Sequence, residues 1–82
     1  MNVIHKLEIT AVCPADKLPD VYACEIHAAR VIPVEQILSE VETLRTAALY
    51  QEDLCQRLHR ALACRVVLIG SHSGVQTTVT CG

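Results

Sequence analysis

The sequence has 82 residues and a formal net charge of −2 at pH 7, and its seven basic residues are scattered along the chain. This composition lacks the positively charged patch of nucleic-acid-binding domains, so we expect no direct contact with nucleic acid. No apolar run approaches the length of about 20 residues that a membrane-spanning helix needs. Charged residues at positions 6 and 8 interrupt the apolar core of a secretory signal, so we expect a cytoplasmic protein without a membrane partner.

Hydrophobic residues make up 51% of the chain, but Tyr22 and Tyr50 are its only aromatic residues apart from histidines. Aliphatic side chains must then form the core, and a chain of this length is close to the lower limit for a self-sufficient core. We expect one domain over residues 1–82 that buries additional surface by forming a homo-oligomer.

The first part of the chain predicts two β-strands joined by a loop. Residues 3–12 alternate between apolar and polar side chains, which is the period of a half-buried strand. Residues 21–31 alternate again, and one face of this second strand would consist of Tyr22, Cys24, Ile26 and Ala28. Two such runs on either side of a loop predict a β-hairpin.

An amphipathic helix is predicted over residues 34–44. Pro33 immediately before it suits the first turn, because an N–H in that turn would have no partner within the helix. Apolar residues recur at helical spacing on one side, and polar residues occupy the other. We expect the helix to bury its apolar side, which consists of Val34, Ile37, Leu38, Val41 and Leu44.

A second helix fits residues 51–63, where three leucines recur at every fourth position. Glu52 and Asp53 at its start suit the positive end of the helix dipole. Residues 65–70 then predict a short buried strand, and residues 75–81 a β-branched strand after a turn. The resulting order, ββααββ, predicts an α+β fold in which two helices cover one face of a four-stranded antiparallel sheet.

Five cysteines are many for this length, but their number is odd and no Cys-x-x-Cys pair occurs. The disulfide framework of a secreted protein more often has an even number, so we expect reduced thiols that mostly serve as small buried side chains. Cys24 and His27 have a spacing found in zinc sites, yet the sequence places no second ligand pair. We expect no bound metal.

The stretch AVCPADKLPDVY (11–22) holds a thiol and a carboxyl group at the two ends of a stiff loop. Pro14 and Pro19 fix the backbone φ angle, and each restricts the residue before it. Cys13 and Asp20 suit a reaction in which a thiolate adds to an electrophilic carbon while a carboxyl group transfers a proton. The alternative is a structural loop with a half-buried cysteine and a turn aspartate.

Two further residues are candidates for contact with a ligand. The Glu52 carboxylate can accept hydrogen bonds from paired N–H groups of a ligand, or it can simply stabilise the N-terminus of its helix. His72 lies at the tip of the predicted turn GSHSG (70–74), where it contacts a ligand or is an exposed loop histidine. The turn is too short for a phosphate loop and has no lysine.

Three stretches together resemble a known family: CPADKLPD (13–20), YQEDL (50–54), and Gly70 with the closing SGV and CG. The family is the 7-cyano-7-deazaguanine (nitrile) reductases of queuosine biosynthesis, which share the tunnelling fold (T-fold) of GTP cyclohydrolase I. The resemblance covers residues 10–82 and implies a thioimide at Cys13, proton donation by Asp20 and anchoring of the deazaguanine edge by Glu52. It also implies sites between the subunits of a homo-oligomer for a small heterocycle such as a deazapurine, purine or pterin.

The chain departs from the family pattern in three places. Gln51 replaces the histidine of the family's His-Glu-Asp, and the Pro-Arg-Gly-Gly turn is shortened to residues 71–74 without arginine. In the stretch that binds the cofactor in the family, only Glu35 matches the family's residue, and the family's lysine is absent. The resemblance implies NADPH as the cofactor, with Glu35 as a candidate contact. The family's arginine and lysine, which carry positive charge, are missing here. Two alternatives therefore stay open: an amidinotransferase-like relative that acts on nitriles without NADPH, and a non-catalytic T-fold binding or assembly module.

Overall fold

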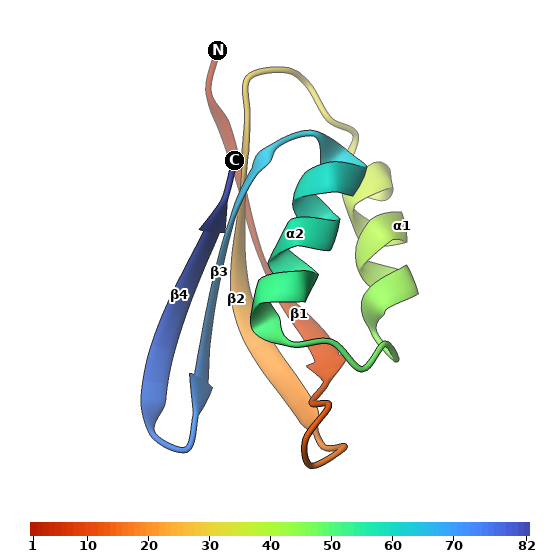
Figure 1. Cartoon of the computed structure of the whole chain (residues 1–82). Helices are drawn as coiled ribbons and strands as arrows, with labels where there is room; N and C mark the ends of the chain where they lie inside the picture. Colours follow the sequence, from red (N-terminus) through yellow and green to blue (C-terminus); the bar gives the residue numbers. More distant parts are fainter.

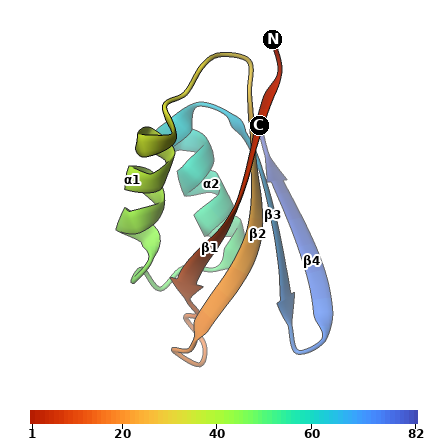
Figure 2. The ribbon, with the colours of Figure 1, turned by 180° about the vertical axis from the view of Figure 1, so that it is seen from behind.

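The computed structural model describes residues 1–82 as a four-stranded sheet and two helices (Figure 1). The elements are β1 (Val3–Val12), β2 (Pro19–Ala28), α1 (Val34–Leu44), α2 (Gln51–Leu62), β3 (Arg65–His72) and β4 (Val75–Cys81). Both helices lie on the same side of the sheet in the opposite views of Figures 1 and 2. The predicted α+β class, the element order and the helices on one face are confirmed. Neither helix is long and apolar enough to cross a membrane.

The sheet is antiparallel throughout, with the strand order β1-β2-β3-β4. β1 and β2 pair from Val3 opposite Ala28 to Val12 opposite Pro19. The second strand therefore lies earlier than the predicted range 21–31, because its partner begins at Val3 and offers no pairing beyond Ala28. Pro19 is compatible with this inner strand because it is the first residue, where its missing N–H interrupts no ladder.

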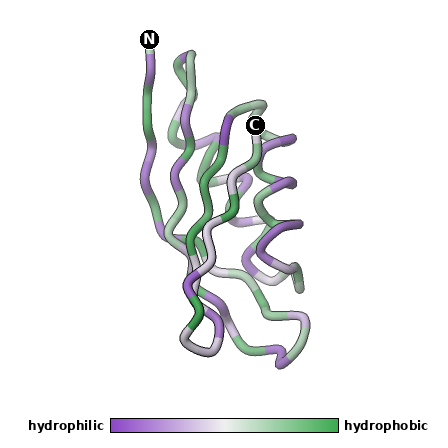
Figure 3. Tube along the Cα trace, turned by 60° about the vertical axis from the view of Figure 1, so that its left-hand side comes forward, coloured by the Kyte–Doolittle hydropathy of each residue, from purple (hydrophilic) through white to green (hydrophobic).

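The core lies between the sheet and the two helices and is mostly aliphatic. The apolar and polar alternation of the strands can be followed along the tube in Figure 3. As predicted, the inward face of β2 is fully buried, and so is the leucine stripe of α2. Each buried leucine or isoleucine side chain contributes about 1.5–3 kcal/mol by leaving water. The buried side chains of β2 and α2 are Tyr22, Cys24, Ile26, Ala28, Gln51, Leu54, Cys55, Leu58 and Leu62.

The first helix buries only part of its apolar side. Ile37 and Leu44 are buried, but Val34 and Leu38 remain 53% and 55% exposed, which corrects the prediction that the whole side is covered. The reason is that α1 lies beside α2 and reaches the sheet only at its outer strand β1. Nothing in the chain covers the part of the helix beyond that strand.

The β3–β4 hairpin has a two-residue turn and is longer than predicted. β3 continues to His72, which pairs with Val75, so His72 is a strand residue and not the tip of a loop. Ser73 and Gly74 form the turn with positive φ angles of 51° and 82°. Two consecutive residues of positive φ match the right-handed twist of a hairpin, which explains why the turn is tighter than GSHSG suggests.

Gly70 lets an aromatic ring lie against the backbone of β3. A Cβ atom at this position would be 2.4 Å from Cδ1 and 2.6 Å from Cε1 of Tyr22 on the neighbouring strand. Tyr22 is buried to 1% exposure and cannot swing away without leaving the core. The glycine is therefore required by packing and not by backbone conformation.

We predict that Gly70→Ala lowers the free energy of unfolding by about 1–3 kcal/mol, because the added methyl overpacks the Tyr22 ring. Urea denaturation measures the loss. In a Tyr22→Leu background the same change should cost much less, since the clashing ring is gone. Equal losses in both backgrounds would contradict the packing explanation.

One side of the molecule exposes apolar residues next to an unpaired strand. β1 and β4 form the two edges of the sheet, and unpaired edges promote association between chains. Beside β1, a groove of about 340 Å³ runs along α1. It is lined by Ile4, His5, Lys6, Leu7, Val34, Ile37 and Leu38.

We predict that the chain associates with copies of itself, because association would cover this groove and pair the sheet edges. Light scattering at micromolar concentration should give a mass that is a multiple of 9.0 kDa. Replacement of exposed Leu38 by Lys should shift the mass downward. A monomer at every concentration would contradict the prediction.

Candidate functional site

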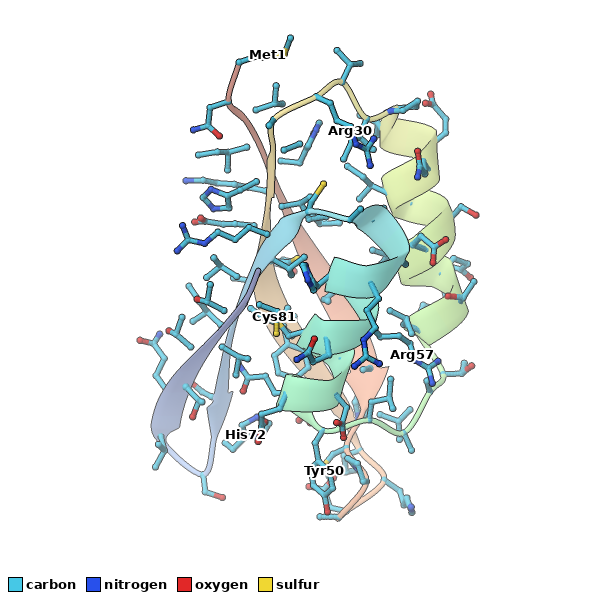
Figure 4. All side chains as sticks on the ribbon, turned by 45° about the horizontal axis from the view of Figure 1, so that its top comes forward. Met1, Arg30, Tyr50, Arg57, His72 and Cys81 are labelled. Atoms are coloured by element: carbon cyan, nitrogen blue, oxygen red, sulfur yellow. The ribbon has the colours of Figure 1, made fainter.

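A pocket of about 530 Å³ lies at the end of the sheet that carries the β1–β2 loop. Tyr50 and His72 lie at this end of the molecule in Figure 4. Four of the residues singled out from the sequence line this pocket together: Cys13, Asp20, Glu52 and His72. Its other lining residues are Pro14, Ala15, Asp16, Tyr22, Leu49, Tyr50, Gln51, Ser71, Ser73 and Thr77.

The loop between β1 and β2, residues 13–18, is closed by its own hydrogen bonds. The Cys13 N–H donates to the Leu18 carbonyl at 2.8 Å, and the Lys17 N–H donates to the Cys13 carbonyl at 2.9 Å. Lys17 adopts a φ of 65°, in the left-handed region, to make this turn. The backbone of Cys13 is thus bonded through both its N–H and its carbonyl, which fixes where its side chain leaves the loop.

The end of β1 also bonds to the segment that leads into α2. The Val12 N–H donates to the Ala47 carbonyl at 3.1 Å, and the Leu49 N–H donates to the Val12 carbonyl at 3.2 Å. Cys13 is the next residue, so these bonds bring the thiol loop beside the start of α2. Two segments far apart in the sequence thereby form one wall of the pocket.

Asp16 is a carboxyl group of the β1–β2 loop, and it lines the pocket together with Cys13. Its Oδ1 accepts a hydrogen bond from the Leu18 N–H at 2.9 Å. This bond is the main cause that lowers the pKa of Asp16, and the nearby Cys13 side chain is the second. Asp16 is exposed and ionised at neutral pH. The sequence interpretation missed it, although it lies only three residues after Cys13.

Asp20 is engaged by two side chains on the sheet. The Tyr22 hydroxyl donates to Oδ2 of Asp20 at 3.4 Å, and Nδ1 of His72 lies 4.0 Å from the same oxygen. Burial and then the charge of Asp20 raise the pKa of Tyr22 to about 12, so its hydroxyl keeps the proton that it donates. The Tyr22 and His72 rings are 6.0 Å apart between centroids. His72 therefore neighbours Asp20 as well as facing the pocket.

Gln51 connects the first turn of α2 to the sheet through two hydrogen bonds. Its side-chain amide is buried and donates to the Leu68 carbonyl on β3 at 2.9 Å and to the Thr77 carbonyl on β4 at 2.8 Å. The next residue, Glu52, is exposed and lines the pocket. The role of Gln51 was not predicted, because nothing in the sequence separates it from an ordinary polar residue at a helix start.

The cysteines differ in access to solvent. Cys24, Cys55 and Cys64 are buried, whereas Cys13 and Cys81 are half-buried. Burial raises the pKa of Cys24 to about 11 and, with a hydrogen bond to Cys81, that of Cys55 to about 12. Both of these thiols stay protonated at neutral pH, and a thiol that cannot ionise is a poor nucleophile.

The residues around the pocket do not fit NADPH. Phosphate groups need cations or clustered N–H donors, but no lysine or arginine lines the pocket, and three carboxyl groups do. Glu35 lies exposed in the first turn of α1 and is not among the lining residues. Its predicted role as a cofactor contact stays a prediction. No group of three or more histidine, cysteine or acidic residues is placed to hold a metal ion.

With this geometry described, comparison with known proteins identifies the fold. No family model matches the chain, and no curated protein matches its sequence. Among solved structures, it is similar to the crystal structure of the archaeosine synthase QueF-Like in the apo form, with a TM-score of 0.90 and 20% sequence identity. The match covers 98% of this chain and 90% of that one. The chain has the tunnelling fold. The resemblance inferred from the sequence is thereby confirmed for the fold. A sequence identity of 20% supports no statement about function.

We predict that Cys13 is the first of the five cysteines to react with iodoacetamide. It lies half-buried at the pocket, whereas Cys24 and Cys55 are buried and protonated. Limited alkylation followed by peptide mapping should place the first label on Cys13, and Cys13→Ala should remove that fast phase alone. Labelling of Cys55 or Cys81 before Cys13 would show that the loop does not present a reactive thiol.

Proposed function

We propose that the protein captures the nitrile group of a 7-deazapurine, or of a similar planar heterocycle, as a covalent thioimide on Cys13. The observation that carries this proposal is that one pocket is lined by a half-buried thiol, two aspartate carboxyl groups and a carboxylate at a helix start. These residues come from the β1–β2 loop, β2 and α2. A pocket that only bound a heterocycle would need Glu52 but no thiol.

The chemistry assigns one role to each side chain. The Cys13 sulfur adds to the nitrile carbon and gives its proton to the Asp20 carboxylate. The electron pair of the broken π bond moves to the nitrogen, and Asp20 passes the proton on to that nitrogen. The Tyr22 hydroxyl and His72 hold the Asp20 carboxyl group at the pocket. Glu52 accepts hydrogen bonds from the N–H edge of the heterocycle, which orients the nitrile toward the thiol.

We infer that the thioimide is resolved by ammonia or an amine, and not by hydride. Attack of ammonia on the thioimide carbon releases the thiol and leaves an amidine, so this step needs no reductant. The acidic pocket favours a cationic ammonium source over a dinucleotide phosphate, which is the reason to prefer this route to the reductase route implied by the sequence. The similarity to an archaeosine synthase supports the same preference.

A second candidate function is a heterocycle-binding or assembly module without chemistry. The exposed groove beside α1 and the open sheet edges favour a part in assembly, and Glu52 alone could anchor a ligand. Under either function we expect a small heterocyclic ligand, a homo-oligomer of this chain and no direct contact with nucleic acid.

Intact-protein mass after incubation with 7-cyano-7-deazaguanine tests the covalent step. Thioimide formation is an addition, so we predict a mass increase equal to the full mass of the nitrile. Cys13→Ala should abolish the adduct, whereas Cys81→Ala, which removes the other half-buried thiol, should retain it. Asp20→Asn should slow the adduct by roughly 10²–10⁴ while iodoacetamide still reacts. Absence of any adduct in the unmodified protein would favour the binding module.

Calorimetry with the same heterocycle tests Glu52. Glu52→Gln places an amide that can donate where two N–H groups need an acceptor, so we predict a loss of about 1.5–3 kcal/mol in binding free energy with an unchanged fold. Asp53→Asn is the matched control, because Asp53 is in the same first turn but does not line the pocket. If Glu52→Gln and the unmodified protein bind the heterocycle with equal affinity, Glu52 only stabilises the start of its helix.

A further inference from the structure

The side chain of Gln51 brings one unused hydrogen-bonding atom to the pocket. Its amide nitrogen Nε2 donates to the Leu68 carbonyl at 2.9 Å and to the Thr77 carbonyl at 2.8 Å. The amide oxygen Oε1 accepts no hydrogen bond from the chain, and it is not sealed from solvent, because the only buried side-chain polar atom without a partner is Nε2 of His5. Gln51 lines the pocket, so this free oxygen meets solvent there.

The orientation of this amide is fixed by the sheet. A flipped amide would place Oε1 against two carbonyl oxygens and would leave both of them without a donor. The residue is only 3% exposed, so the side chain cannot turn away from the strands without disturbing the packing around it. Oε1 is therefore a preorganised acceptor that cannot become a donor. Such an atom favours a ligand with an N–H group at this place and disfavours one with an oxygen there.

We infer that Gln51 is a specificity-determining residue whose Oε1 accepts a hydrogen bond from the exocyclic amino group of the heterocycle. The inference deepens the proposed function, and it rests on heterocycle binding at Glu52 and not on the covalent step. In a heterocycle such as 7-deazaguanine, Glu52 accepts the ring N–H and the neighbouring N–H of the amino group. The second N–H of that amino group needs another acceptor. Gln51 directly precedes Glu52 in the first turn of α2, and both line the pocket.

This assignment names the class of substrate that the pocket selects, which is a planar heterocycle with a primary amino group beside a ring N–H. An analogue without the second amino N–H leaves the nearly buried Oε1 without a partner. The unpaired acceptor costs free energy, which corresponds to a loss of about 10-fold in affinity. An analogue with an oxo group in place of the amino group is disfavoured further, because its oxygen would face Oε1 and the Glu52 carboxylate.

Calorimetry with two ligands that lack a nitrile tests the inference apart from the chemistry at Cys13. The ligands are 7-deazaguanine and its 2-methylamino analogue, and neither can form a thioimide. The analogue keeps one amino N–H beside the ring N–H for Glu52 and carries a methyl group in place of the second. For the unmodified protein we expect the analogue to bind about 10-fold more weakly.

The variant Gln51→Met removes the acceptor and keeps a side chain of similar length. We expect it to bind 7-deazaguanine about 10-fold more weakly than the unmodified protein and to bind the two ligands with equal affinity. Asp53→Asn is the matched control, because Asp53 is in the same first turn but does not line the pocket, so it should keep the full discrimination. Gln51→Met also loses two bonds to the sheet, so urea denaturation must show that it is folded. If it is not, the two ligands on the unmodified protein decide the inference.

Equal affinity of the unmodified protein for the two ligands would overturn the inference. A folded Gln51→Met variant that keeps the full discrimination would overturn it as well, since another group would then contact the amino N–H. If neither ligand binds, the inference fails together with the role proposed for Glu52. Discrimination between the ligands without any adduct from 7-cyano-7-deazaguanine would support the inference and contradict only the capture of a nitrile by Cys13.

Discussion

The side-chain amide of Gln51 joins the two layers of the molecule at the place where the pocket forms. Its two N–H donors bond to carbonyls on β3 and β4, and Gln51 is the only buried polar side chain of the chain. A buried amide or carbonyl without a partner costs about 1–3 kcal/mol, so this pair of bonds specifies one position for the start of α2. Tyr50 and Glu52, on either side of Gln51, owe their place at the pocket to that constraint.

The remainder of the pocket depends on backbone bonds that converge on the same point. Val12 bonds to Ala47 and Leu49, and the following loop closes on itself through Cys13 and Leu18. The thiol is thus placed by the sheet, by the connection between the helices and by its own loop. A site assembled from such fixed parts is preorganised, and preorganisation is what allows a few polar groups to direct a reaction.

Much of the fold could be predicted from the sequence, because periodicity reports which face of an element is buried. The alternation around Tyr22 and the leucine stripe of α2 correspond to buried faces in the structure. Periodicity does not report what lies opposite a face, and so it could not foresee that Val34 and Leu38 stay exposed. The end of a strand depends on its partner strand. This is why the predicted bounds of β2 and the predicted loop position of His72 differ from the structure.

The pocket lining could be predicted from the sequence where it follows a local pattern, and not where it depends on tertiary contacts. Cys13 and Asp20 were proposed from the Pro-bounded loop and Glu52 from its place at a helix start, and all three line one pocket. The place of Asp16 in the pocket lining depends on the hydrogen bonds that close its loop, and the bonds of Gln51 span distant strands. Neither follows from residue type or spacing. Glu35 was chosen by register with a family and lies away from the pocket.

A crystal structure of the protein after incubation with 7-cyano-7-deazaguanine tests the central claim most directly. The account predicts continuous electron density from the Cys13 sulfur to the former nitrile carbon, with the N–H edge of the heterocycle on Glu52 and the thioimide nitrogen facing Asp20. A heterocycle bound at Glu52 without a bond to Cys13, or density on another cysteine, would contradict it.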